Sequence, residues 1–150
     1  MTVPHIPRGY HSITPYLAVA GASRLIDFLQ QAFDAIVETR TDRPDGSIAH
    51  AAVRISDSVV EVCDAQGAWL PMPAAIHVYV PDVDLTFRHA IAAGGVSLYE
   101  PVDMFYGERS GGVKDPVGNH WYIATHTEDV SEDEMQRRAA QAFGEKPPTQ

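Results

Sequence analysis

The sequence has a single cysteine, few positive charges and no long apolar run. Because Cys63 has no second cysteine to pair with, an intrachain disulfide is excluded and no oxidising compartment is required. The 11 Lys and Arg residues stand against 20 Asp and Glu residues, and the formal net charge of −9 argues against binding to nucleic acid or to an anionic membrane. The composition therefore favours a neutral or cationic small molecule as the partner.

Signals for export and for membrane insertion are missing as well. Residues 1–12 lack the basic and apolar regions of a signal peptide. No apolar stretch approaches the ~20 residues that cross a bilayer as a helix. We therefore expect a cytoplasmic protein. With 150 residues, 45% of them apolar, the chain is long enough to bury the core of one domain.

The first half of the chain shows the pattern strand, helix, strand, strand, strand. Residues 12–19 alternate and carry β-branched and aromatic side chains, which predicts a strand. A helix follows, because apolar side chains recur at helical spacing at Leu25, Phe28, Leu29 and Ala32. Turn sequences then separate three further strands, expected at 35–40, 48–55 and 59–64.

The same order returns after a proline-containing connector at 65–75. We expect a strand at 76–80 and a helix over about 82–93, which Gly94 and Gly95 end. Three strands follow, at 96–99, at about 109–114 and at 120–125. The halves superpose with a shift of about 60 residues, so the element order is repeated although identity between the halves is weak.

This repeat predicts an α+β fold in which two βαβββ modules in one chain form a cleft between curved sheets. The modules span about 12–64 and 76–127, and together they make a single domain over 1–127. Residues 128–150 should form a C-terminal helix, opened by a capping box that begins at Ser131, and a frayed tail from Gly144.

Glu61 is the candidate general base. It lies between two valines of an apolar strand, and burial there would raise the pKa of its carboxyl group. The alternative is a pairing with Arg54 or Arg109, and the sequence does not separate the two readings. Cys63 shares the face of Glu61 and is expected to be a packed thiol.

Aromatic side chains are the candidate ligand-binding groups. Tyr16, Tyr79 and Tyr122 have the parity of cleft-facing residues in their strands, and Tyr106 lies in a nearby loop. They form either a ligand pocket or ordinary core contacts. Arg109 lies in a glycine-rich stretch and either binds a ligand's carboxylate or phosphonate or pairs with Glu108 or Asp103. Residues 115–119 are expected to be a structural turn.

Four segments resemble the PhnB-like branch of the vicinal-oxygen-chelate superfamily, which includes glyoxalases and bleomycin-resistance proteins. They are IPRGYHSITPYLAV (6–19), HAAVRISDSVVEV (50–62), IHVYVPDVD (76–84) and KDPVGNHWYIATHTEDVSEDEM (114–135). The resemblance implies the two-module fold derived above and assembly as a homodimer. It also implies a cleft in which metal-using members place one ligand on the first and one on the last strand of each half.

The positions that match those ligands are Thr14, Glu61, Ala75 and Tyr122. Only Glu61 is a good metal ligand, so we expect no cofactor at the usual site. A displaced divalent-metal site made by His50, Glu61 and His77 is a second possibility, because two imidazoles and a carboxylate can hold zinc, iron or nickel. Otherwise His50 and His77 would be hydrogen-bonded cleft residues that contact the ligand.

Three functions remain open at this point. The first is a protein that binds a small organic molecule in its cleft without the usual metal. The second is an isomerase, lyase or epimerase that uses Glu61 as a base or the displaced metal as a Lewis acid. The third is a non-catalytic interaction or regulatory module, because the fold alone does not choose among these classes.

Overall fold

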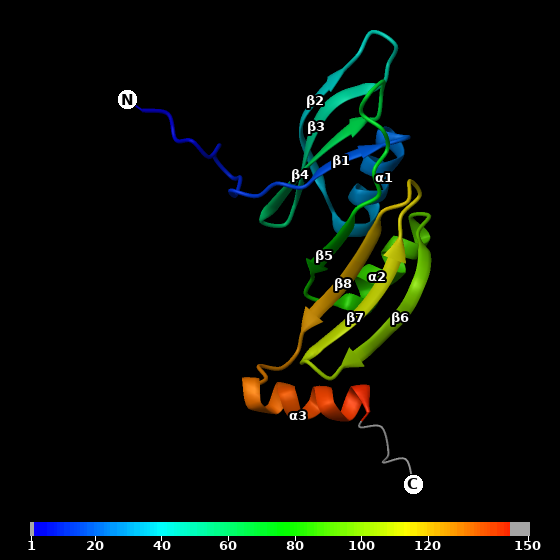
Figure 1. Cartoon of the computed structure of the whole chain (residues 1–150). Coiled ribbons are helices and arrows are strands. Elements are labelled where there is room, and N and C mark those ends of the chain that lie inside the picture. Colours follow the sequence, from blue (N-terminus) through cyan, green and yellow to red (C-terminus); the bar gives the residue numbers. More distant parts are fainter. Residues whose placement is uncertain (1, 145–150) are drawn as a thin grey trace.

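The computed structural model describes residues 2–144, which form two four-stranded sheets and three helices (Figure 1). The first half contains β1 (Tyr16–Val19), α1 (Ala22–Phe33), β2 (Ile36–Asp42), β3 (Ile48–Ile55) and β4 (Ser58–Asp64). The second half contains β5 (Ala75–Tyr79), α2 (Val83–Ala92), β6 (Val96–Met104), β7 (Glu108–Lys114) and β8 (His120–His126). The helix α3 (Glu132–Phe143) follows. The α+β fold with two βαβββ modules is thereby confirmed, and the expected tail at 145–150 lies outside the described residues.

Two strands differ in length from the sequence-based expectation. β1 begins at Tyr16 rather than at residue 12, because pairing with β4 begins where Tyr16 lies opposite Glu61. β6 continues to Met104 instead of ending at residue 99. Its pairing with β7 shifts register on both sides of Tyr99, and such bulges let a strand pass an irregular stretch without losing its partner.

The two sheets have the same topology. Their strand orders are β1-β4-β3-β2 and β5-β8-β7-β6, and in each sheet the edge strand that opens the half runs parallel to the strand that closes it. Tyr16 lies opposite Glu61, and His77 lies opposite Tyr122. Both members of the second pair follow their counterparts by 61 positions, so the two pairs occupy equivalent places in the repeat.

Each sheet buries one face against a helix. In β1 the buried residues Leu17 and Val19 alternate with more exposed ones, and in β8 the same holds for Trp121 and Ile123. The side chains of α1 and α2 pack on these faces in one continuous apolar core. Phe33, at the end of α1, joins the halves because its ring lies 5.1 Å from that of Trp121.

A buried aspartate fixes the start of β5. The carboxylate of Asp115 accepts hydrogen bonds from the backbone N–H groups of Val117 and Asn119, from the Asn119 side chain and from the Trp121 indole, at 2.8–3.0 Å. The Asn119 side chain in turn accepts from the backbone N–H of Ala74, at 3.0 Å. This chain of bonds places β5 beside β8. Residues 115–119 form the structural turn that the sequence predicts.

Asp64 has the equivalent role in the first half. Its carboxylate accepts from the backbone N–H groups of Gly21 and Ala22 at the start of α1, and from Ile48 at the start of β3. Burial acts to raise the pKa of Asp64, but these three donors and the charge of Arg43 outweigh it, and the pKa is lowered. One carboxylate thus joins a helix and two strands.

The helix α3 lies across the end of the second sheet (Figure 1). Ser131 caps it by accepting a hydrogen bond from the Glu134 backbone N–H, as the capping box predicts. Phe143 packs edge-to-face on Phe105 in the β6–β7 turn. Gly107 in that turn has a positive φ, and a Cβ there would lie 2.3 Å from the backbone oxygen of Glu128, so the turn requires glycine.

We predict that Asp115→Ala lowers the free energy of unfolding by about 3 kcal/mol, because it leaves several buried donors without an acceptor. Urea unfolding measures this change. Asp27→Ala, on the exposed side of α1, is the matched control and should change stability little. An equal effect of the two substitutions would show that the Asp115 hydrogen bonds do not hold the second half together.

Candidate functional site

The face of the first sheet that turns away from α1 carries Tyr16, Glu61 and His50. Tyr16 and Glu61 lie opposite each other, and the small side chain of Ala52 follows on β3. His50 lies two residues before Ala52 in β3 and therefore on the same face, and its Nε2 atom is 3.1 Å from Oε1 of Glu61. Both side chains remain partly exposed, so the pair is accessible to a ligand.

Aromatic rings surround this pair. The Tyr16 ring is 6.1 Å from the His50 ring and 6.4 Å from the ring of Trp69, which lies in the connector between the halves. Burial raises the pKa of Tyr16 to about 12, with further contributions from Cys63 and Glu61. Tyr16 therefore stays a neutral phenol at neutral pH and can donate a hydrogen bond.

The N-terminal segment lies beside the same face. A shallow cavity of about 360 Å³ is lined by Glu61, by Thr14 and by residues of the segment between His5 and Ser12. Thr14 precedes β1 and contacts the backbone oxygen of His11 at 3.5 Å. The residue directly opposite Glu61 is thus Tyr16, while Thr14 lies at the edge of the face.

The corresponding face of the second sheet carries a carboxylate among aromatic rings. Glu108 of β7 is two strands away from β5 and pairs with His126 of β8, but the small Ala124 of β8 lies between Tyr79 and Ser110, so the path from β5 to Glu108 runs diagonally over Ala124. The side chains of Tyr79 and His77 can therefore reach across. The Tyr79 hydroxyl donates to Glu108 Oε1 at 2.6 Å, and His77 Nε2 lies 3.5 Å from Oε2.

Tyr99 and Tyr122 complete this second surface. A Cβ on Gly112 would lie 2.5 Å from the Tyr99 ring, so the absence of a side chain at Gly112 lets that ring lie across the strand. The two tyrosine rings stack, with centroids 6.4 Å apart. The Tyr99 hydroxyl shares a hydrogen bond of 2.8 Å with Ser110, which fixes the ring's position.

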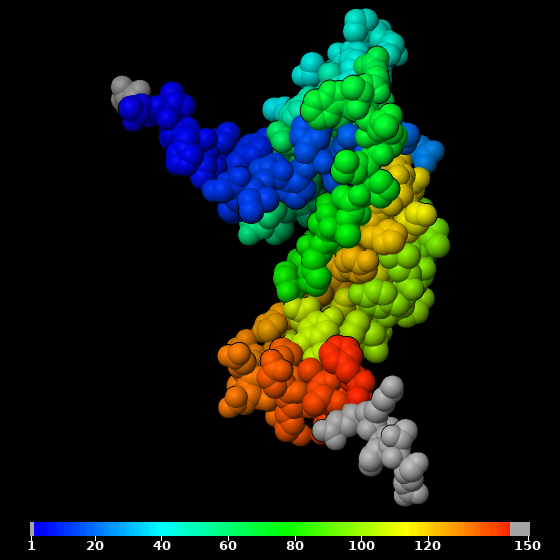
Figure 2. All heavy atoms as spheres, viewed as in Figure 1, coloured from blue at the N-terminus to red at the C-terminus, as the bar shows by residue number. Residues whose placement is uncertain are grey.

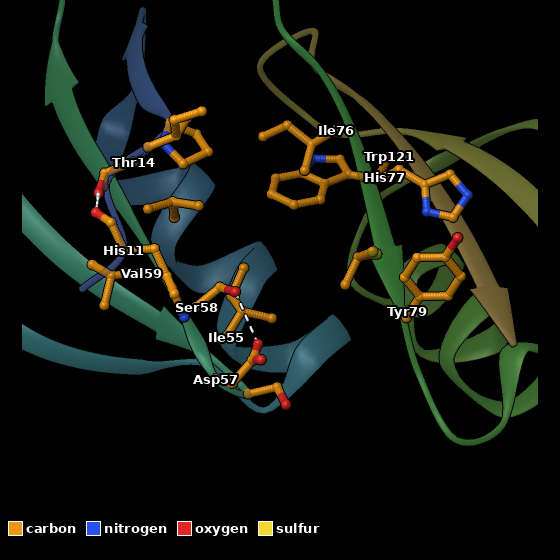
Figure 3. A pocket seen from close by; sticks show the side chains of 15 residues that line it. His11, Thr14, Ile55, Asp57, Ser58, Val59, Ile76, His77, Tyr79 and Trp121 are labelled. Atoms are coloured by element: carbon orange, nitrogen blue, oxygen red, sulfur yellow. Dashed lines mark hydrogen bonds between the residues drawn. The ribbon is translucent and has the colours of Figure 1, made fainter. Parts of the chain in front are cut away.

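A crevice of about 560 Å³ separates the two halves (Figure 3). Its walls are mostly apolar, with Ile55 and Val59 on the first half facing Ile76 and Trp121 on the second. The lining residues are His11, Ile13, Thr14, Pro15, Ile55, Ser56, Asp57, Ser58, Val59, Val60, Ile76, His77, Val78, Tyr79 and Trp121. Two of the predicted ligand-binding residues, His77 and Tyr79, belong to this lining as well as to the open face of the second sheet.

The predicted site residues thus form two groups. Tyr16, His50 and Glu61 gather on the first sheet, and His77, Tyr79 and Tyr122 lie on the second. The displaced-metal hypothesis requires His50, Glu61 and His77 in one place, whereas His77 lies beside Glu108. Among residues 2–144, no three His, Cys, Asp or Glu side chains are close enough to hold a metal ion.

The usual metal positions of the fold offer equally poor donors. Ala75 has no lone pair and lies opposite His120, and Thr14 and Tyr122 are neutral oxygen groups. Glu61 is the one strong ligand among the four positions, and a divalent ion needs several such donors to replace its water. The side chains at these positions of a single chain do not fit the metal.

Arg109 points away from the open face. It has the opposite parity to Glu108 in β7, and its guanidinium binds Asp84 of α2 at 2.8 Å and Asp103 of β6 at 3.3 Å. These two carboxylates raise the pKa of Arg109. Of the two partners expected from the sequence, Asp103 pairs with Arg109 and Glu108 does not. The charge of Arg109 is thus neutralised by carboxylates of the protein itself.

Tyr106 lies at the turn end of the second surface. Burial raises the pKa of its hydroxyl, and the charges of Glu108 and Tyr99 contribute. Glu108, Tyr99 and Ser110 were not identified from the sequence. The alternation of Glu108, Ser110 and Gly112 in β7 carried the signal, because residues two apart in a strand share a face.

Sequence comparison places the chain in a known family. A family model for the Glyoxalase/Bleomycin resistance protein/Dioxygenase superfamily matches residues 9–123, and the chain belongs to this superfamily. Over 136 residues it is 35% identical to the uncharacterised protein Mb0911c of Mycobacterium bovis. The alignment covers 83% of this chain and 90% of that protein. The resemblance inferred from the sequence is confirmed.

Solved structures agree at the level of the fold. A PhnB protein from Bacillus cereus matches with a TM-score of 0.60 and 16% identity, over 77% of this chain and 99% of that one. TnmS3, described as an antibiotic-binding protein from a Streptomyces species, matches with a TM-score of 0.62 and 16% identity, over 85% and 99%. No helix within residues 2–144 is long and apolar enough to span a membrane.

Proposed function

We propose that this protein binds a small organic molecule against the open faces of its two sheets, without the metal that other members of the superfamily use. The observation that carries this proposal is the pair of carboxylate and aromatic surfaces, one around Glu61 and one around Glu108, on the faces that turn away from α1 and α2. Aromatic walls with a few fixed polar groups are typical of ligand sites.

The side chains on the two faces support binding of a small molecule. Tyr16, His50 and Glu61 would contact the ligand on one side, and His77, Tyr79 and Tyr122 on the other. Tyrosines offer large rings at little cost in conformational entropy, and their hydroxyls orient a bound molecule. The fold is compatible with this role, because TnmS3 is described as an antibiotic-binding protein.

We further propose that the protein acts as a homodimer. Apolar side chains around the edge strand β1 are highly exposed, among them Ile13 (87%), Leu70 (73%) and Met72 (73%). The connector that carries the last two runs along β1, where the Met72 N–H donates to the Ala18 oxygen at 3.0 Å, and it lies on the surface (Figure 2). A second copy would cover these residues, and its open faces could complete the ligand site.

An isomerase, lyase or epimerase is the second candidate function, favoured by the contact between His50 and Glu61. A carboxylate 3.1 Å from an imidazole can take a proton from a carbon next to a carbonyl group, and the imidazole can orient it. Tyr16, a neutral phenol beside Glu61, could donate a hydrogen bond to the oxygen that gains charge.

In both functions we place the protein in the cytoplasm, since its buried Cys63 is a free thiol.

We expect a screen of aromatic small molecules to yield ligands whose binding shifts backbone amide resonances of β4, β5 and β8. Tyr122→Ala should weaken such a ligand at least tenfold, or about 1.4 kcal/mol, whereas Asp27→Ala on α1 should not. A ligand recovered unchanged supports a binding protein. A converted product, lost in Glu61→Gln while binding remains, supports the enzyme. A separate groove lies between α2 and β6, lined by residues that include Phe87, Ile91 and Val96, and ligands that map only to it would contradict both functions.

Sedimentation of the untagged protein should show a species of twice the 16.4 kDa chain mass. Replacing Leu70 and Met72 by Asp should shift this species to the monomer, because buried carboxylates would lack partners. Replacing Val3, an exposed apolar residue away from β1, by Asp is the control. A monomer at all concentrations would contradict the dimer and leave ligand binding to a single chain.

A further inference from the structure

Glu108 is a largely buried carboxylate with little internal compensation. Its side chain is 12% exposed, and its contacts are one hydroxyl, from Tyr79, and the imidazole of His77 at 3.5 Å. Within the part of the chain that the structure describes, no lysine or arginine forms an ion pair with it. A carboxylate has about four acceptor positions, and withdrawing it from water without a cation is costly.

The residues around Glu108 do not offset its negative charge. Its hydrogen bond raises the pKa of Tyr79, and its charge helps to raise that of Tyr106. The nearest arginine in sequence, Arg109, faces α2 and is held by Asp84 and Asp103. The protein as a whole carries a formal charge of −9, so no excess of positive charge elsewhere offsets this site.

Aromatic faces stand on the same surface. Tyr79 is 60% exposed, its ring lies 4.6 Å from that of His77, and Tyr99 and Tyr122 stack nearby. The electron-rich face of a phenol ring attracts a cation electrostatically, most strongly where water is partly excluded. A carboxylate set among such rings therefore favours a positively charged group over a neutral one of the same shape.

Resting on the proposed function, we infer that the ligand of the second sheet carries a cationic nitrogen, an ammonium or a quaternised ring nitrogen, which binds at Glu108 among the tyrosines. The bound cation supplies the charge that Glu108 lacks inside the protein. The planar remainder of the ligand lies on the rings of Tyr79 and Tyr122. Neutral and anionic molecules of the same outline bind the surface more weakly.

The test uses two probes of nearly the same shape, N-methylquinolinium and quinoline, at a pH where quinoline and histidine are neutral. Each is titrated into the full-length protein while amide resonances of β5, β7 and β8 are followed. N-methylquinolinium should bind about tenfold more tightly than quinoline. Glu108→Gln should remove that advantage by weakening the cation and leaving quinoline unchanged, since Gln keeps the size of the side chain.

Two control variants separate the local charge from other effects. Glu100→Gln removes the same charge from an exposed position of β6 and should leave the preference intact. Tyr79→Phe keeps the ring and removes the hydroxyl that partly compensates Glu108, so the preference should persist or grow. This second variant also tests the inference if Glu108→Gln does not fold.

Equal affinity for the two probes would overturn the cationic ligand while small-molecule binding stands. A preference that survives Glu108→Gln or disappears in Tyr79→Phe would also overturn it, as would amide shifts confined to other elements. Absence of binding by both probes would overturn the inference. If the aromatic library also yields no ligand, the proposed function itself fails.

Discussion

Each sheet is covered by a helix on one face only, and the rest of the structure depends on this constraint. Period-two alternation sends Leu17, Val62, Trp121 and Ile123 toward the helices, and the core that they form holds the halves together. The same alternation forces the intervening residues onto the opposite face, which α1 and α2 do not cover. Polar and aromatic side chains collect there, and both candidate surfaces follow from this geometry.

Two aspartates fix where α1, β3 and β5 begin. Asp64 joins the start of α1 to β3, and Asp115, through Asn119, sets where β5 begins. Because β5 starts at Ala75, His77 comes to lie opposite Tyr122, just as Tyr16 lies opposite Glu61. The repeat therefore preserves backbone geometry while the chemistry of the two faces has diverged, with a histidine-carboxylate pair on adjacent strands in one half and a carboxylate under tyrosines in the other.

The element order, the repeat and the family could be predicted from the sequence, because strand alternation and helical spacing are local signals. The pairing of His50 with Glu61 was within reach of the same reasoning, since both residues have the parity of the open face. Glu108 was not found, because its contact with Tyr79 runs diagonally across β8, over the small Ala124 that lies between Tyr79 and Ser110. The proposed convergence of His77 with His50 and Glu61 required the relative placement of the two sheets, which no pattern along the chain encodes.

We propose that this protein recognises its ligand through side chains of the open faces and not through a bound metal. Elemental analysis of untagged protein, before and after incubation with zinc, nickel and iron, tests this most directly. We expect far less than one metal ion per chain in each case, with no change in a Glu61→Ala, His77→Ala double variant. A nearly stoichiometric metal that is lost in the double variant would contradict this proposal and would show that Glu61 or His77 binds a metal ion.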